Sequence, residues 1–341
     1  MDVKVITRHA PTNYGSLLQS MATVAVIEKL GCNCEIIDYQ RPNESGLRAI
    51  KVGLKIKQEW NKNIIKRILY IIIRYPVERL GELKFAALRE KYLKMTRPFI
   101  TGDDLSVLSA DVFMTGSDQV WGTMFDSEYD QNYFLVFAPN NVRKVAYSAS
   151  FGKNQFSDSI VEIYKKLLSK YDGITVREDS AVNLLNKWNI PNYGQVLDPA
   201  LLLDAQDWSK YIKKDIKGKF ILIYEIHNNP LLDEYAKNFS KKVKLPLIRI
   251  SAILRQVFRG GKFIYRPDID DFLSYINSCE YLITDSFHGT VFGLVFNKEI
   301  IEVMPNNTTG GRNYSLLKLV GLTDRIVKNQ IDFSAIENRI N

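Results

Sequence analysis

The chain has 341 residues, long enough for two domains, and its 46% hydrophobic and 25% charged fractions are typical of a soluble globular protein. Its net charge of +8 is unevenly placed: residues 47–97 contain fourteen Lys or Arg and four Glu, a balance of +10, which leaves −2 for the remaining residues. No aromatic platform or nucleic-acid motif accompanies the basic segment, so these features argue against nucleic-acid binding.

The first residues, 1–6, read directly as a strand, with neither an apolar leader region nor a small-residue cleavage site. The three cysteines, Cys32, Cys34 and Cys279, form no paired framework, and we expect them to be reduced thiols. Together these features favour a cytoplasmic protein.

Strand-like and helix-like segments alternate along the whole chain. In the first half we expect strands at 3–6, 35–39, 112–115, 144–148, 173–176 and 196–198, and helices at 16–30, 159–170 and 180–188. In the second half we expect strands at 220–224, 247–250, 262–265, 281–284 and 300–303, and helices at 231–242 and 269–278. Such alternation predicts an α/β fold with parallel sheets. We therefore expect two Rossmann-like domains, 1–204 and 205–341, that face each other across a cleft.

The basic segment 47–97 is predicted to be a helical insertion in the first domain. Residues 64–75 mix large aliphatic side chains with cations, and this run is too short and too charged to span a bilayer. One alternative is a helical hairpin whose aliphatic face packs on the parent domain while its cations are solvated. The other is contact with an anionic membrane surface or a lipid-linked substrate.

The strongest candidate site is the junction between the strand at 281–284 and the helix expected to follow it. Asp285 or Ser286 can cap that helix, Gly289 allows close approach of backbone to a ligand, and Thr290 adds a hydroxyl. The first turn of a helix beyond the carboxyl end of a parallel strand is a natural anion site. His288 would stand beside the bound anion; the alternative is a surface histidine near a helix cap. His9 and His227 also follow apparent strands, with less supporting context.

A second candidate follows the strand at 112–115, where Ser117, Asp118, Gln119 and Trp121 come in succession. Asp118 could accept a proton from a sugar hydroxyl or orient it, and Trp121 could stack on a sugar face. The alternative is an aspartate that caps a helix, beside a core tryptophan. The segment Asn13-Tyr14-Gly15 can open a helix toward the same region.

Two arginines complete the candidate set. Arg177 stands where a strand meets a helix, so its planar fork could clamp a carboxylate or phosphate, or pair with Glu178 or Asp179. Arg312 follows Gly310-Gly311 in what reads as a flexible loop and could also meet an anion. The sequence lacks a dinucleotide fingerprint, a Walker motif, Cys/His metal spacing and a nucleophile elbow. We therefore expect a small anionic substrate, with no cofactor and no metal.

Five blocks in this order resemble the polysaccharide pyruvyltransferase family. They are 13–19, 115–121, 176–180, 284–290 and the Gly311-Arg312 segment before Leu316-Leu317, and the resemblance extends from residue 3 to about residue 325. It implies a glycosyltransferase-B-like fold, phosphoenolpyruvate as the co-substrate, and a pyruvate ketal on a saccharide as the product. His288 and Arg177 match donor-site positions. Some family members have arginine where this chain has Ser286, and Arg312 is the candidate to replace that cation.

From the residues and the resemblance together we expect the following roles. The donor would be bound by Ser286, Gly289, Thr290 and Arg312 of the second domain together with Arg177 of the first, with His288 as general acid or as the group that stabilises departing phosphate. The first domain would bind the acceptor, with Asp118 as the catalytic residue and Asn13, Tyr14, Gly15, Ser117, Gln119 and Trp121 around it. The acceptor would be a saccharide linked to polyprenyl diphosphate, met at the inner face of the cytoplasmic membrane. The alternatives are a nucleotide-sugar glycosyltransferase of the same architecture and a non-catalytic scaffold of polysaccharide assembly at the membrane.

Overall fold

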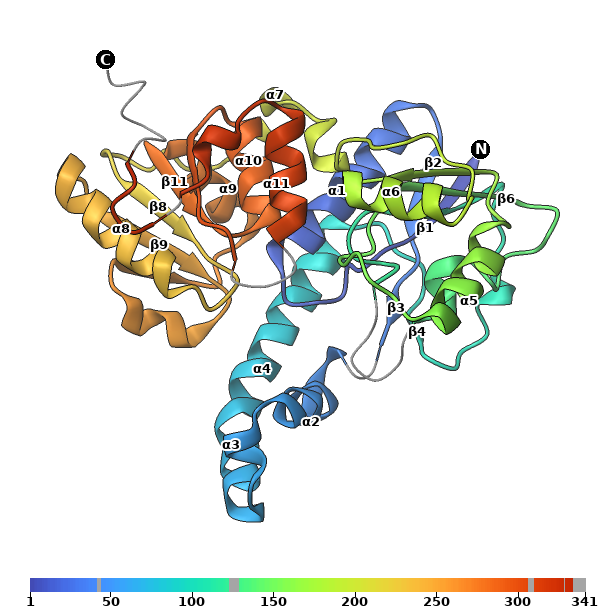
Figure 1. Cartoon of the computed structure of the whole chain (residues 1–341), viewed down its shortest axis with the longest axis horizontal. Coiled ribbons are helices and arrows are strands. Elements are labelled where there is room, and N and C mark those ends of the chain that lie inside the picture. The colour runs from blue at the N-terminus through green and yellow to red at the C-terminus, as the bar shows by residue number, and fades with distance from the viewer. Residues whose placement is uncertain (42–43, 123–128, 306–309, 328, 334–341) are drawn as a thin grey trace. The chain divides into compact units, whose positions relative to one another are not determined.

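The computed structural model describes residues 1–41, 44–122, 129–305, 310–327 and 329–333. Its chain contacts divide the protein into two compact units, Met1–Pro199 and Ala200–Asn341 (Figure 1). Each unit contains its own parallel β-sheet and its own hydrophobic core. The α/β architecture expected from the alternation of segments is therefore confirmed.

The sheet of the N-terminal unit has the strand order β2-β1-β5-β6-β7, and every pair in it is parallel. Its strands are β1 (Asp2–Ile6), β2 (Asn33–Ile36), β5 (Val112–Thr115), β6 (Arg143–Ala149) and β7 (Gly173–Val176), and a separate short pair joins β3 (Tyr39–Gln40) to β4 (Phe99–Ile100). The helices beside the sheet are α1 (Tyr14–Lys29), α5 (Asp158–Leu168) and α6 (Asp179–Lys187), with 3-10 turns η2 (Leu105–Val107) and η3 (Gln131–Phe134).

The strand predicted at 196–198 is wrong. Gln195 forms one isolated bridge with Val176, and Val196 donates a single backbone hydrogen bond to the Val176 carbonyl. The segment is apolar enough to look like a strand, but it leaves the sheet edge after this contact. Its last residue, Asp198, is buried and binds side chains described below.

The sheet of the C-terminal unit has the strand order β10-β9-β8-β11-β12, again parallel throughout. The strands are β8 (Ile221–Tyr224), β9 (Leu247–Ser251), β10 (Lys262–Tyr265), β11 (Tyr281–Thr284) and β12 (Glu299–Glu302). The helices are α7 (Ala205–Ser209), α8 (Pro230–Val243), α9 (Ile269–Ser278), α10 (Phe287–Val295) and α11 (Gly310–Leu319), with 3-10 turns η4 (Pro199–Leu201), η5 (Leu254–Arg259) and η6 (Thr323–Arg325). All four residues of the central strand β8 are buried, as its continuous apolar sequence predicts.

The basic insertion forms three helices: α2 (Gly46–Ile56), α3 (Gln58–Asn61) and α4 (Ile64–Tyr92). Helices α2 and α3 lie along the outer half of α4 (Figure 1), where Ile50, Leu54 and Tyr70 form a small core. The inner half of α4 returns to the unit, and Phe85 packs on Tyr14 of α1 with 5.0 Å between ring centroids. The insertion is thus helical within the described residues. No helix within the described residues has the length and hydropathy needed to cross a membrane.

Candidate functional site

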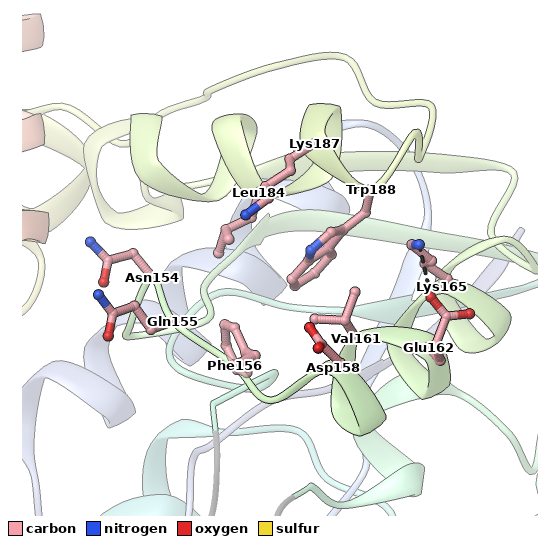
Figure 2. Close-up of a pocket in the computed structure, with 10 residues that line it drawn as sticks. All are labelled: Asn154, Gln155, Phe156, Asp158, Val161, Glu162, Lys165, Leu184, Lys187 and Trp188. Carbon is pink, nitrogen blue, oxygen red and sulfur yellow. Dashed lines mark hydrogen bonds and ion pairs between the residues drawn. The ribbon is translucent and has the colours of Figure 1, made fainter.

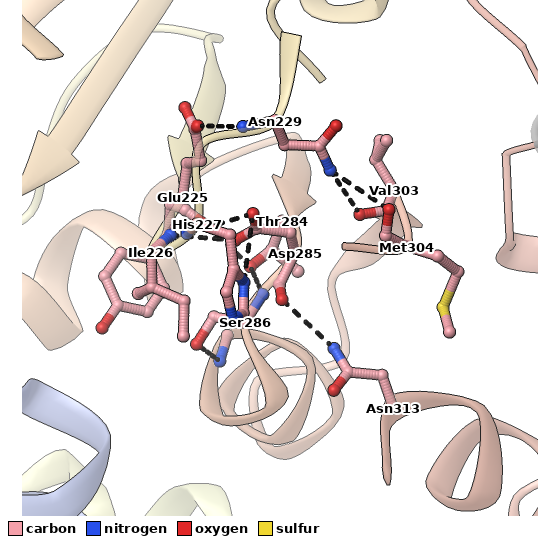
Figure 3. Close-up of polar contacts among 12 residues, drawn as sticks. Glu225, Ile226, His227, Asn229, Thr284, Asp285, Ser286, Val303, Met304 and Asn313 are labelled. Carbon is pink, nitrogen blue, oxygen red and sulfur yellow. Dashed lines mark hydrogen bonds and ion pairs between the residues drawn. The ribbon is translucent and has the colours of Figure 1, made fainter. Parts of the chain in front are cut away.

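The carboxyl edge of the C-terminal sheet gathers the residues after β8, β11 and β12. Strands β8 and β11 are parallel neighbours with Tyr224 opposite Thr284, so the residues that follow them lie at one edge. Asp285, fully buried, accepts hydrogen bonds from the backbone N–H groups of Ile226 (2.8 Å) and His227 (3.2 Å). The Nδ1 atom of His227 also lies 3.3 Å from the Asp285 carboxylate (Figure 3). The side chain of His227 is 22% exposed, so a partly accessible imidazole lies beside a buried carboxylate.

His288 lies in the first turn of α10, directly after the β11 strand. Of the two residues predicted to cap this helix, Ser286 is the cap: its hydroxyl oxygen accepts the Gly289 N–H at 3.3 Å. His288 is only 7% exposed, and its ring forms a T-shaped pair with that of Phe287, with 5.2 Å between centroids. The surface-histidine alternative is therefore wrong, because His288 is a largely buried residue at the positive end of a helix.

Gly289 and Thr290 face the protein interior rather than open space. A Cβ atom on Gly289 would stand 2.2 Å from Oγ1 of Thr284, so the glycine is required for packing of α10 on β11. The Thr290 hydroxyl is buried and lies 2.6 Å from Glu302 and 3.2 Å from the Ser286 carbonyl. This arrangement does not support the prediction that the Thr290 hydroxyl contacts the donor substrate.

Glu302, at the end of β12, is a residue that the sequence analysis missed. It is fully buried, and burial raises the pKa of its carboxyl to about 8. A protonated Glu302 can donate to Thr290 Oγ1, which leaves the threonine hydrogen for the Ser286 carbonyl. Its other oxygen accepts a hydrogen bond from Asn313 at 2.6 Å. The sequence carried one signal for it, a carboxylate inside the apolar run of a predicted strand.

Arg312 lies in the first turn of α11, not in a flexible loop as predicted, and it is half-buried. The next residue, Asn313, is buried and donates to Glu302 and, at 3.5 Å, to the backbone carbonyl of Asp285. Figure 3 shows Asn313 reaching the β11–α10 junction from α11. The start of α11, and Arg312 with it, is thus tied to the same junction as His288.

In the N-terminal unit, Asp118 has an unusual backbone conformation, with φ of +82°. Such conformations in a residue other than glycine are strained and recur at functional sites. The Asp118 carboxylate accepts hydrogen bonds from Ser16 Oγ (2.9 Å) and from the Gln119 N–H (2.8 Å). Because Ser16 belongs to α1 and Asp118 follows β5, the carboxyl edge of this sheet holds a partly exposed carboxylate in a defined orientation.

Arg177 is an ion-pair residue in this structure. Its buried guanidinium lies 3.2 Å from Asp198, 3.7 Å from Asp118 and 3.9 Å from Glu178. The ion-pair alternative is therefore the one observed, with Asp198 rather than Glu178 or Asp179 as the nearest partner. Three carboxylates offset the positive charge of Arg177. The structure therefore indicates that Arg177 supports Asp118 through their ion pair.

The remaining acceptor candidates separate into two groups. Trp121 and Ser117 are fully buried: Trp121 packs among Phe134, Phe151 and Tyr171, and the Ser117 hydroxyl donates to Asp198 at 2.7 Å. A sugar-stacking role for Trp121 is wrong in this structure, and the core-tryptophan alternative is correct. The ring of Tyr14 is likewise buried.

The other group lies near Asp118. Asn13 caps α1 by accepting the Gly15 N–H at 2.8 Å, which positions the turn that carries Ser16. The half-buried Gln119 follows Asp118 directly, and its side chain lies against Gly152.

A separate pocket of about 540 Å³ lies between α5 and α6 (Figure 2). Phe156 and Trp188 form its apolar part, and Asp158 and Lys187 are among its polar residues. None of the predicted site residues lines it. Across the part of the chain that the structure describes, no group of three or more His, Cys, Asp or Glu side chains is placed to hold a metal ion.

Two parallel sheets, with polar residues at their carboxyl edges, define a glycosyltransferase-B-like α/β protein. The fold resembles S. aureus MnaA in a co-structure with UDP (TM-score 0.52, 12% identity, 98% of this chain and 86% of that chain). It also resembles UDP-GlcNAc 2-epimerase from Methanocaldococcus jannaschii (TM-score 0.52, 13% identity, 98% of this chain and 91% of that chain). A third similar fold is that of a putative UDP-N-acetylglucosamine 2-epimerase from Listeria monocytogenes (TM-score 0.51, 12% identity, 99% of this chain and 86% of that chain). At these identities the likeness concerns the fold alone.

The sequence itself is more specific. The family model for polysaccharide pyruvyl transferase matches residues 13–307, and the chain belongs to that family. No match was found among curated proteins. The family assignment made from the sequence blocks is therefore confirmed.

Proposed function

We propose that this protein transfers the enolpyruvyl group of phosphoenolpyruvate to a saccharide and closes it to a cyclic pyruvate ketal, releasing phosphate. The family match supports pyruvyl transfer to a polysaccharide precursor. The observation that carries the proposal is the β11–α10 junction, where His288, the oriented His227 and a helix N-terminus meet at one sheet edge. This arrangement suits a small anion whose reaction requires proton transfer.

The proposed chemistry has two steps, an addition followed by a substitution at the same carbon. A first sugar hydroxyl attacks C2 of phosphoenolpyruvate, its proton passes to a base, and C3 takes a proton to become a methyl group. Phosphate then leaves C2 as the second hydroxyl attacks, and the proton of that hydroxyl departs with it. The reaction therefore needs one acid to protonate C3, one base for the hydroxyls, and a group that stabilises the departing phosphate. A carboxylate and a phosphate on the donor need cations and backbone donors.

For the donor, we assign the phosphate to the N-terminal end of α10, beside Ser286, whose hydroxyl and carbonyl oxygens already accept the N–H groups of Gly289 and Thr290. Arg312 is the cation proposed for the donor carboxylate or phosphate, since Asn313, its neighbour in α11, bonds to the same junction. Arg177 matches a donor position in the family, but its guanidinium lies among carboxylates. We therefore keep it in the proposal as the residue that orients Asp118.

For proton transfer, His288 remains the proposed general acid, or the group that stabilises phosphate as it departs. His227 is a second candidate, because Asp285 holds its Nδ1 side and leaves the rest of the ring accessible. In the N-terminal unit, Asp118 is proposed to accept the proton of the acceptor hydroxyl, with Asn13, Gly15 and Gln119 around it. The acceptor we propose is a saccharide on polyprenyl diphosphate, with no cofactor beyond the co-substrate.

The decisive test is an assay with phosphoenolpyruvate and candidate lipid-linked saccharides. Phosphate release and a mass gain of one pyruvate ketal on the acceptor should appear together. His288→Ala should lower turnover at least about a hundredfold, the scale of an acid–base residue, while thermal unfolding reports whether the variant is folded. A folded alanine variant with full turnover would remove His288 from the mechanism. Transfer from a UDP-sugar without use of phosphoenolpyruvate would instead favour the glycosyltransferase alternative.

A further inference from the structure

Helix α4 exposes a row of large aliphatic side chains. Six residues of its first three turns are between 47% and 75% exposed: Ile64, Ile65, Ile68, Leu69, Ile72 and Ile73. Their spacing of one, three and four places them along one side of the helix. We call these six residues the α4 face. Isolated exposed aliphatics are ordinary, but a contiguous row of six marks a surface that contacts something else.

The α4 face is not the packing surface of the insertion. Helix α4 contacts α2 and α3 through its other side, where Tyr70 is buried against Ile50 and Leu54. The sequence left open whether the aliphatic residues pack on the parent domain, and the exposure of all six shows that they do not. The insertion thus has an internal core on one side and an apolar face on the other.

The charges around the α4 face indicate its partner. Segment 47–97 has a balance of +10, and three of its four glutamates already pair with cations of the same segment, in Glu59–Lys62, Glu78–Arg74 and Glu82–Arg79. A second copy of the chain would bring the same positive charge to the contact and would be repelled. An anionic lipid surface attracts these cations and accepts the aliphatic side chains.

We infer that the α4 face docks the protein on an anionic membrane surface, with α4 lying in the plane of the headgroups. The row from Ile64 to Ile73 is ten residues, about 15 Å of helix, which fits an interfacial contact and not a span. The flanking exposed cations, Lys66 and Arg67, would lie at headgroup level.

The position of a nearby pocket is consistent with this docking. A pocket of about 130 Å³ is lined by Arg79 and Leu83 of α4 together with Ala10 and Thr12, which follow β1. Arg41 and Arg89 also line it. The pocket therefore connects α4 with the loop before Asn13, the cap of α1. If the proposed reaction is correct, a lipid-linked acceptor would reach the N-terminal unit at this end of α4.

The test is flotation of the full-length protein with vesicles of phosphatidylcholine alone or with about 30% phosphatidylglycerol, in the absence of both substrates. The protein should float only with the anionic vesicles, and less at about 0.5 M salt than at about 0.1 M. Ile65→Glu/Ile72→Glu should weaken binding at least tenfold, whereas Val107→Glu, at an exposed aliphatic residue elsewhere in the same unit, should not. Lys66→Glu should weaken binding about fivefold or more, and the exposed Lys217→Glu should have little effect.

Failure of the unmodified protein to float with anionic vesicles would overturn the inference. So would an oligomer in analytical ultracentrifugation that the Ile65→Glu/Ile72→Glu variant converts to monomers, since the face would then be a contact between copies. Because the vesicles contain no substrate, neither result bears on the proposed reaction. Phosphate release with a soluble acceptor tests that reaction separately.

Discussion

Glu302 is a carboxyl that folding keeps protonated near neutral pH, and this has a consequence for stability. Burial raises its pKa from 4.5 to about 8. Between pH 4.5 and pH 8, therefore, the folded state keeps a proton on Glu302 that the unfolded state has lost. Its contribution to the free energy of unfolding is complete below pH 4.5 and is lost as the pH rises toward 8.

Replacing Glu302 by glutamine should remove this pH dependence. Glutamine has the shape of the protonated acid, so its NH₂ can donate to Thr290 while its oxygen accepts from Asn313. We expect Glu302→Gln to match the unmodified protein at about pH 4 and to melt roughly a few degrees higher at about pH 8.5. Thermal unfolding across this range measures the difference, with the exposed Glu234→Gln as the control. A constant difference at all pH values would mean that Glu302 is already ionised in the folded state.

The His227–Asp285 contact makes a second prediction about single residues. If Asp285 acts on the reaction by orienting His227, the two side chains form one unit and their losses are not additive. His227→Gln and Asp285→Asn should each lower turnover about ten- to a hundredfold, and the double variant should be no worse than the poorer single one. Multiplied losses in the double variant, with an unchanged pH profile of turnover, would assign Asp285 a structural role alone.

At the scale of elements, the β11–α10 junction depends on close packing at one glycine. Gly289 stands over Thr284, whose hydroxyl donates to the Tyr224 carbonyl at 2.7 Å and accepts the Ser286 N–H at 3.0 Å. Gly289→Ala would displace that hydroxyl and should destabilise the protein by about 1–3 kcal/mol. Gly311→Ala is the control, since a Cβ there meets nothing within 4 Å. Equal melting temperatures for the two variants would contradict this account of the junction.

The elements themselves could be predicted well from the sequence, for a physical reason. The buried strands are continuous apolar runs, as at 221–224, and the polar residues directly after them must lie at the carboxyl edge of a parallel sheet. These two properties of the sequence are enough to place His288 and Asp118 at sheet edges. The segment 196–198 was misassigned because apolar character alone does not require pairing along a whole strand.

The direction in which each side chain points could not be predicted from the local sequence. Trp121 follows Asp118 closely, yet its ring belongs to an aromatic core contributed by segments far away in the chain. The Thr290 hydroxyl points to Glu302, twelve residues further on, for the same reason. The exposure of the α4 face was equally hidden, because a row of isoleucines looks the same whether or not a domain covers it.

At the scale of the whole molecule, the basic insertion with its α4 face and the His288 junction belong to different units. The basic excess lies in the insertion of the N-terminal unit, whereas the His288 junction lies in the C-terminal unit. Substitutions on the α4 face can therefore be separated from substitutions at the reaction centre. This separation is what makes the membrane inference and the proposed reaction independently testable.

The two units also have separate hydrophobic cores, and this predicts how the protein unfolds. The main core of the N-terminal unit includes Trp121 and Tyr164, whereas that of the C-terminal unit includes Ile223 and Ile283. Proteins with two cores commonly depart from two-state unfolding. Ile223→Ala removes a fully buried side chain and should destabilise its own unit by about 2–5 kcal/mol.

Calorimetry should therefore show two transitions in the variant, one shifted to lower temperature and one close to its position in the unmodified protein. Val303→Ala, in the same C-terminal core, should shift the same transition, and Ile174→Ala, in the N-terminal core, should shift the other. The contrary outcome is that all three substitutions shift one transition whose calorimetric and van't Hoff enthalpies are equal. That result would show that the two cores unfold as one cooperative unit, because only coupling between the units would carry a local loss of packing to the whole chain.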